Sequence, residues 1–195
     1  MTLVKDRRVL GTFLSQLEQV DESVLDDYIA QWESFELDGR VVMTHEGNIE
    51  RYMYFVLDGI QKSYYLRDGK EHIIAFTYFP SLSGIPESFL SQQPSRYFLS
   101  TINKSRFLRI SYEKHQQMLV KHPPLERLFR KATELLLIDI LHRYYEMMAF
   151  DMETRFKTFT QRSPHLLQML SQKDIASYLK IDPSNFSKLI NRIKI

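Results

Sequence analysis

The segment QKDIASYLKIDPSNFSKLINRI, residues 172–193, contains two short helical patterns. Ser171, followed three residues later by Asp174, has the capping-box pattern of a helix start. Asp182 offers a side-chain acceptor for a second start, and Pro183 suits the first position of a helix. The segment therefore predicts two helices joined by a short turn.

Each of these predicted helices has an apolar side and a polar side. The turn is Lys180-Ile181, where many motifs of this type have glycine. A small residue at Ala176 would allow the second helix to cross the first closely. We expect the residues at three-to-four spacing to face inward, namely Ile175, Ala176 and Leu179 in the first helix and Phe186, Leu189, Ile190 and Ile193 in the second.

The outer side of the second helix carries amide, hydroxyl and cationic groups, with no acid after its cap. Asparagine suits adenine, lysine and arginine suit guanine or phosphate, and serine suits either. This pattern favours a helix-turn-helix that binds double-stranded DNA, although a plain helical hairpin in an all-α core would share the inner pattern. The predicted contact residues are Gln172, Lys173, Ser184, Asn185, Lys188, Asn191 and Arg192.

Charge is distributed unevenly along the chain. The net charge is only +2, yet residues 154–195 hold eight basic and two acidic residues, so this stretch is +6 and residues 1–153 are −4. Such asymmetry is typical of a region that binds a polyanion. A solvated basic face is the alternative interpretation.

Composition argues against several function classes. The chain has no cysteine, and its six histidines lack the spacing of a zinc site, so we expect no disulfide, cysteine nucleophile or metal. No apolar run is long enough for a signal peptide or a membrane span. No nucleophile–base pair or phosphate-binding glycine loop is recognisable. We therefore expect a cytoplasmic protein that is not an enzyme.

Residues 35–110 consist of short runs rich in β-formers, separated by turn signals. The turns are expected at Asp38-Gly39, Glu46-Gly47, Asp58-Gly59 and Asp68-Gly69, where glycine permits positive φ. Such strands at spacings of about ten residues predict an antiparallel sandwich or barrel. The predicted strands are VVM (41–43), YMYFVL (52–57), IQKSYYL (60–66), HIIAFTYF (72–79), RYFLSTI (96–102) and RFLRI (106–110).

Helical patterns flank this β-rich region. Residues 12–34 predict one or two short helices, and residues 112–120 predict another that Pro123-Pro124 would stop. Apolar residues then recur at three-to-four spacing over residues 125–148, which predicts a long amphipathic helix. We expect its stripe to pack on a second copy of the chain, with packing on its own barrel as the alternative. Asp139 and Arg143 lie close to the stripe and argue against a continuous zipper.

The order of these parts resembles that of the Crp/Fnr transcription regulators. FELDGRVVMTHEGNIERYMYFVLDGIQKSYY (35–65) resembles the glycine-punctuated β-roll of that family. GIPESFLSQQPSRYFLSTI (84–102) stands where its phosphate-binding cassette should be, and residues 172–193 stand at its DNA reader. The likeness spans nearly the whole chain.

The resemblance implies an α+β fold with three parts. Residues 1–111 would form N-terminal helices and a double-stranded β-helix, the jelly roll of cyclic-nucleotide-binding domains. Residues 112–150 would form a helical connector with the dimerisation helix, and residues 151–195 a helix-turn-helix domain. The implied partners are DNA, a second copy paired through the 125–148 helix, and RNA polymerase.

The predicted cassette departs from the nucleotide-binding pattern of Gly-Glu followed by Arg-Ser or Arg-Thr. Counted from Gly84, the acid position falls on Ile85, the arginine position on Ser95 and the next hydroxyl on Arg96. Glu87 and Arg96 would serve only if the loop shifted. We therefore expect weak or absent cyclic AMP binding, with a pocket that takes another small-molecule effector or is filled by aromatic residues.

The sequence ends two residues after Ile193, where family members usually continue into a two-stranded wing. Without a wing, phosphate anchoring would depend on Arg155, Lys157, Arg162, Lys173 and Lys194. The alternative function is a small-molecule-sensing module whose terminal helices dock a protein partner instead of DNA.

Overall fold

The computed structural model describes residues 2–192, which divide into two compact units. Unit 1 comprises residues up to 65 together with residues 75–134. Unit 2 comprises residues 66–74 and the part of the chain from residue 135 onward. The predicted division into residues 1–111, 112–150 and 151–195 places its boundaries elsewhere and stays a prediction.

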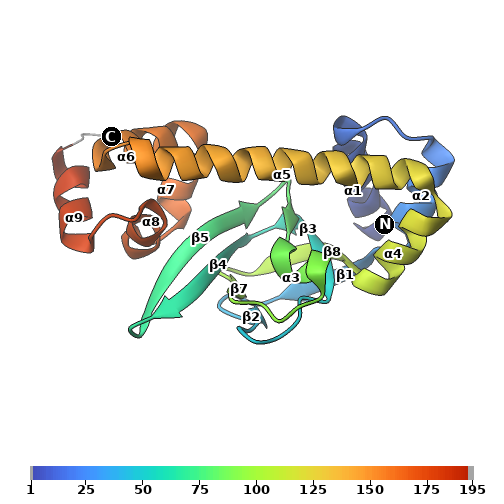
Figure 1. Cartoon of the computed structure of the whole chain (residues 1–195), viewed down its shortest axis with the longest axis horizontal. Coiled ribbons are helices and arrows are strands. Elements are labelled where there is room, and N and C mark those ends of the chain that lie inside the picture. The colour runs from blue at the N-terminus through green and yellow to red at the C-terminus, as the bar shows by residue number, and fades with distance from the viewer. Residues whose placement is uncertain (1, 193–195) are drawn as a thin grey trace. The chain divides into compact units, whose positions relative to one another are not determined.

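The β-rich region forms two four-stranded sheets with the strand orders β1-β8-β3-β6 and β2-β7-β4-β5 (Figure 1). Strands distant in sequence pair antiparallel, as β1 does with β8, where Phe35 lies opposite Phe107. This is the predicted double-stranded β-helix. The strands are β1 (Glu33–Leu37), β2 (Val42–Thr44), β3 (Tyr52–Asp58), β4 (Ile60–Arg67), β5 (Lys70–Tyr78), β6 (Leu82–Ser83), β7 (Phe98–Thr101) and β8 (Ser105–Ser111).

Each predicted strand run contains a strand, whereas β1 and β6 were not among the predicted runs. Glycines at three predicted turns have positive φ, namely Gly47 (84°), Gly59 (87°) and Gly69 (70°). The prediction at Asp38-Gly39 is wrong in position, because the positive φ falls on Arg40 at 65°. Gly39 is needed there for space, since a Cβ atom on it would lie 3.0 Å from the Cα of Asn103.

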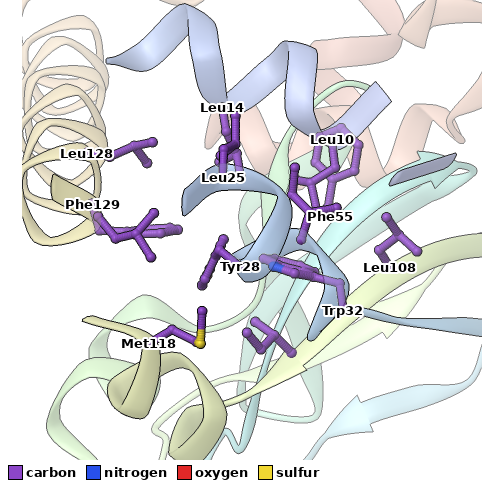
Figure 2. Packing of buried hydrophobic residues seen from close by; sticks show 13 residues of the cluster. Leu10, Leu14, Leu25, Tyr28, Trp32, Phe55, Leu108, Met118, Leu128 and Phe129 are labelled. Carbon is purple, nitrogen blue, oxygen red and sulfur yellow. The ribbon is translucent and has the colours of Figure 1, made fainter. Parts of the chain in front are cut away.

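Successive residues of β3 face different cores, as the two-residue period of a strand requires. Tyr54 and Val56 pack inside the roll with Phe107, whereas Phe55 packs against the helices. The helix-side core surrounds Tyr28 and Trp32, which are both fully buried (Figure 2). Its helices are α1 (Thr2–Leu17), α2 (Glu22–Ala30), α4 (Tyr112–Lys121) and the first half of α5 (Pro123–Ala149).

Pro123-Pro124 does not only end a helix. The helix α4 ends at Lys121, and the two prolines occupy the first turn of α5. Proline is tolerated there because N–H groups in the first turn of a helix make no intrahelical hydrogen bond. The first helix begins at Thr2, ten residues earlier than predicted. Three further helices were not predicted: α3 (Pro86–Ser91), α6 (Met152–Arg162) and α7 (Leu166–Met169).

His115 is a titratable group buried in the helix-side core. It is 3% exposed, and its Nδ1 lies 2.9 Å from the Tyr28 hydroxyl. Its ring also stands edge-on to Phe129, at a centroid distance of 4.6 Å. Burial lowers the pKa of His115 to about 4, because the apolar surroundings disfavour the charged imidazolium.

Replacing Gly59 with alanine should destabilise unit 1 strongly. A Cβ atom there would lie 2.3 Å from Ser105 Oγ and 2.6 Å from the Lys104 carbonyl oxygen, at a positive φ. We expect Gly59→Ala to cost about 2–4 kcal/mol from clash and strain together. Gly47→Ala, with positive φ but no atom within 4 Å, should cost about 1–2 kcal/mol. Urea unfolding followed by the fluorescence of Trp32 measures both, and equal losses would contradict the close-approach argument.

His115 should make unit 1 less stable in acid. Its folded pKa of about 4 lies below the ordinary value of 6.5, so the unfolded chain takes up the proton first. With His115 neutral, the free energy of unfolding of unit 1 has its full value above pH 6.5. It decreases as the pH falls from 6.5 to 4, by up to about 3 kcal/mol. The variant His115→Gln cannot titrate and should show a flatter dependence over this range in urea unfolding. Parallel curves for the two proteins would show that His115 is not responsible.

Candidate nucleic-acid interface

Two short helices of unit 2, α8 (Gln172–Leu179) and α9 (Pro183–Arg192), form the candidate interface. Both predicted helix starts are confirmed. Ser171 Oγ accepts a hydrogen bond from the Asp174 N–H at 3.0 Å. Asp182 Oδ1 accepts one from the Ser184 N–H at 2.9 Å. Hydrogen bonds from the Ser184 hydroxyl and N–H lower the pKa of Asp182 and keep its carboxylate charged.

Lys180 takes the place of the glycine that such turns often contain. Its backbone is left-handed, with φ 55° and ψ 43°. The Ile181 N–H then donates to the Ala176 carbonyl at 3.0 Å, which closes the end of α8. A side chain in this conformation costs about 1–2 kcal/mol. Lysine therefore performs the conformational role of glycine at the cost of some strain.

The inner faces of α8 and α9 are buried as predicted. Phe186 and Leu189 of α9 are 1% and 2% exposed, and Ile190 is half-buried. Phe186 meets Phe156 of α6 edge-on, with 5.5 Å between the ring centroids. Ile175, Ala176 and Leu179 of α8 are also buried, whereas Ile193 and Lys194 lie outside the described residues.

All seven predicted contact residues are exposed: Gln172, Lys173, Ser184, Asn185, Lys188, Asn191 and Arg192. Five of them lie along α9, and Gln172 and Lys173 begin α8. The structure therefore brings a row of amide, hydroxyl and amino groups to the outer side of α9. Its formation follows directly from the burial of Phe186 and Leu189 on the opposite side.

Among the seven, Ser184 bonds to its own cap residue Asp182, whereas Arg192 has a partner on another helix. Its guanidinium donates to the carboxylate of Glu153 in α6, which also pairs with Lys157 at 2.9 Å. The hydrogen bond from Lys157 and the charges of both cations lower the pKa of Glu153. Glu153 lies one residue before the stretch counted as +6, so the sequence count did not include it. Lys157 and Arg192 are therefore partly neutralised.

A second charged cluster holds α8 in place. Glu146 of α5 accepts from Arg162 at 2.9 Å and lies 3.5 Å from Arg143. The Arg143 guanidinium lies 3.8 Å from the centre of the Tyr178 ring and donates to the Tyr178 carbonyl near the end of α8. Burial lowers the pKa of Arg143. This cluster was not predicted, and the only sequence signal was the Arg143/Glu146 spacing of three residues on a helix.

The tip of the β4–β5 hairpin also contacts α8. Ser177 Oγ accepts from the Ile73 N–H at 3.0 Å and donates to the Glu71 carbonyl at 2.9 Å. One hydroxyl thus satisfies two backbone groups at the edge of a strand. The helix preceding the turn is therefore held by hydrogen bonds from two separate segments of unit 2.

The long helix α5 divides its apolar stripe between two environments. Leu125 and Leu128 are fully buried in the core of unit 1, as the alternative interpretation of the stripe expects. From residue 135 to the end of α5, within unit 2, the large apolar side chains are exposed except Met147, which is half-buried. A row with four–three–four spacing consists of Leu137, Leu141, Tyr144 and Met148, which are 55%, 56%, 63% and 71% exposed.

The five predicted effector residues lie in different surroundings. Ile85 is buried in the core of the roll, and Ser95 Oγ donates to the Tyr97 carbonyl at 2.8 Å in its own turn. Glu87 and Arg96 form an ion pair at 3.8 Å, with side chains 54% and 82% exposed. Gly84, at φ 146°, begins the turn that leads into α3.

The histidine, aspartate and glutamate side chains of the described residues form no group of three that could hold a metal ion. Within residues 2–192, no helix combines the length and the apolar character needed to cross a bilayer.

No family model and no curated protein matches the chain. Solved structures do. FixK2 from Bradyrhizobium japonicum aligns with a TM-score of 0.69 at 19% identity, covering 83% of this chain and 84% of FixK2. CLP from Xanthomonas campestris, described as a c-di-GMP-responsive global regulator, aligns with a TM-score of 0.66 at 16% identity, covering 89% and 92%.

The β-roll is also found in a different setting. The regulatory domain of Toxoplasma gondii PKA, solved with cAMP, aligns with a TM-score of 0.52 at 16% identity. The alignment covers 57% of this chain and 44% of that one, so this chain spans less than half of that relative. At such identities the likeness concerns the fold. The chain therefore has the fold predicted from its resemblance to the Crp/Fnr regulators, with a cyclic-nucleotide-binding-like β-roll and a long helix.

Proposed function

We propose that this protein is a homodimeric DNA-binding transcription regulator of the Crp/Fnr type. The observation that carries the proposal is the outer face of α9, where Ser184, Asn185, Lys188 and Asn191 are exposed and no acid follows the cap. An α-helix fits the major groove of B-DNA, and these side chains can bond to base edges and phosphates there.

In this proposal, α9 reads bases and the start of α8 contacts the backbone. Asn185 and Lys188 are three residues apart, so they lie on the same side of α9. Lys173 is exposed in the first turn of α8, where the positive end of the helix dipole also favours a phosphate. Asp182 accepts hydrogen bonds from the Ser184 N–H and hydroxyl, which direct its carboxylate toward the cap. The other acids near the two helices are Asp174, in the first turn of α8, and Glu153, which pairs with Arg192.

Ion pairs within unit 2 reduce the number of basic residues that are available to contact phosphates. Arg162 and Lys157 were predicted as anchors, but each already pairs with a glutamate of unit 2. A phosphate would have to replace that partner, which reduces the gain from each contact. We therefore assign the main backbone contact to Lys173 and treat Arg162, Lys157 and Arg192 as residues that hold the helices together.

The exposed row on α5 supports the homodimer. Leu137, Leu141, Tyr144 and Met148 follow the alternating four- and three-residue spacing of a two-helix seam. A second copy of the same helix is the partner that such a row fits, because an isologous interface presents the same residues from both sides. A dimer would present two copies of α9 to a two-fold symmetric DNA site.

Cyclic AMP would not bind to this chain through the cassette contacts that the family uses. The two charged cassette residues, Glu87 and Arg96, neutralise one another at the surface. Binding a cyclic phosphate would require Arg96 to turn inward and leave Glu87. We therefore propose that cyclic AMP binds weakly or not at all.

Base contacts and backbone contacts should respond differently to mutation. Lys188→Ala or Asn185→Ala should relax the preference at one or two base pairs and cost about 1–3 kcal/mol on the specific site. Lys173→Ala should weaken binding to all sequences and lower the slope of log affinity against log salt by about one. Fluorescence anisotropy with a selected duplex and a random duplex, at several salt concentrations, measures these effects.

Lys114→Ala, an exposed lysine on α4 of unit 1, is the matched control and should change neither quantity. Equal losses on specific and random DNA for Lys188→Ala would contradict the base-reading role. Absence of salt-dependent DNA binding by the unmodified protein would favour the alternative, in which the terminal helices dock a protein partner.

Charges in the exposed row should separate the dimer. The double variant Leu137→Glu/Leu141→Glu places four carboxylates in one seam and should sediment as a monomer at micromolar concentration. Val120→Glu, at an 84% exposed position of α4 in unit 1, is the matched control and should leave the dimer intact. Analytical ultracentrifugation distinguishes the two, and an unchanged dimer in the double variant would place the interface elsewhere.

A further inference from the structure

A cavity of about 550 Å³ lies within unit 1, lined by β1, β2, β3, β8 and the loop between β2 and β3. Its volume is within the range of small-molecule sites. Apolar walls come from Phe35, Leu37, Val42, Met43 and Ile49. None of the five predicted effector residues lines it, although Ile85 packs in the same core cluster as Tyr54.

Tyr54 provides a polar group inside this cavity. The residue is 4% exposed, and its hydroxyl has no hydrogen-bond partner within the described part of the chain. The hydroxyl itself is not fully buried, so it is accessible to a ligand that enters the cavity. Burial and the nearby charge of Glu50 raise the pKa of Tyr54, so the hydroxyl keeps its proton and can act as a donor.

Arg109 provides a fixed cation beside the phenol. Its guanidinium carbon lies 3.9 Å from the centre of the Phe35 ring and 4.4 Å from that of Tyr52. Its Nε donates to Glu33 at 2.8 Å, while its terminal amino groups have no hydrogen-bond partner in residues 2–192. The two rings hold the guanidinium in place. The half-exposed Glu33 accepts from only one of the three guanidinium nitrogens of Arg109.

Two more charged residues line the cavity. Arg51 is exposed, and its guanidinium has no ion-pair partner among the described side chains. Glu50 is 1% exposed, and its oxygens are occupied by the Thr44 hydroxyl at 2.7 Å and the Tyr52 N–H at 3.3 Å. Burial raises the pKa of Glu50. The unused donors are therefore those of two arginines and a phenol.

We propose that this cavity binds a small organic monocarboxylate with an apolar body. The carboxylate would accept hydrogen bonds from Arg109 and Tyr54, with Arg51 at the opening, because arginine matches a planar carboxylate and pairs with it strongly. The apolar body would lie against Leu37, Met43 and Ile49. A bulky polyanion is disfavoured, since most of the wall is apolar and Glu50 is acidic.

Occupancy of the cavity can reach the cassette through the β2–β3 loop. The Glu50 N–H donates to Ser88 Oγ of α3 at 2.9 Å, and the Ser95 N–H donates to the Asn48 carbonyl at 2.8 Å. A ligand that moves this loop must therefore move α3 or break these bonds. We infer that the carboxylate is an effector. The effector role rests on the proposed DNA-binding function, whereas the binding of the carboxylate in the cavity does not.

The binding test uses the full-length protein without DNA. Isothermal titration with 3-phenylpropionate and hexanoate, and with their amides as uncharged controls, should show one carboxylate site per chain. Tyr54→Phe and Arg109→Met should each weaken the carboxylate by about tenfold or more, given the strength of hydrogen bonds to charged groups. Arg96→Ala, in the predicted cyclic-nucleotide cassette, should leave affinity unchanged.

Tyr54→Phe removes a single oxygen and should keep the fold, so its melting temperature serves as the folding control. No binding of either carboxylate at 5 mM, or equal binding of acid and amide, would overturn the site. The regulatory statement is tested by DNA affinity with and without saturating 3-phenylpropionate, for the unmodified protein and for Tyr54→Phe. Ligand binding without any change in DNA affinity would overturn the effector role alone, while absence of DNA binding in both conditions would instead count against the proposed function.

Discussion

The burial of Phe186 and Leu189 is the constraint on which the functional surface depends. Each side chain gains about 1.5–3 kcal/mol from leaving water, and Phe156 of α6 is positioned to receive the Phe186 ring. Because the polar side chains of α9 lie on the side opposite Phe186 and Leu189, burial of the apolar side also fixes the direction of the polar side. The polar row of α9 is therefore presented outward by packing. Among the described residues, Ser184 of this row bonds to the cap Asp182, and Arg192 pairs with Glu153.

Much of this arrangement could be predicted from the sequence. Capping chemistry at Ser171 and Asp182, a strictly periodic apolar side and the turn glycines depend on residues close together in the chain, and local rules describe them well. β1 was not among the predicted strand runs because ESFEL is short and two of its five residues are acidic. It is a strand because β8 offers it a partner more than 60 residues away, and such pairing leaves no local signal.

The candidate sites were less predictable for the same reason. The exposed contact residues of α9 follow from periodicity, but the pairing of Arg192 with Glu153 joins two helices and appears only in three dimensions. The cassette illustrates the converse case: Ile85 and Ser95 were chosen by counting along the chain from Gly84, yet the burial of one and the turn bonding of the other depend on the roll. Tyr54 and Arg109 were not considered at all, since strand residues with alternating burial give no indication of a cavity.

The cluster of Arg143, Glu146, Arg162 and Tyr178 has a consequence for the response to ionic strength. Glu146 is only 12% exposed, and Arg143 is 20% exposed. Ions screen exposed charges over about 8–10 Å at physiological concentrations but act much less on covered ones. In the proposed function, raising the salt concentration should thus release the protein from DNA while the α5–α8 contacts persist. The dissociated protein would retain its helix arrangement, ready to rebind when the medium is diluted.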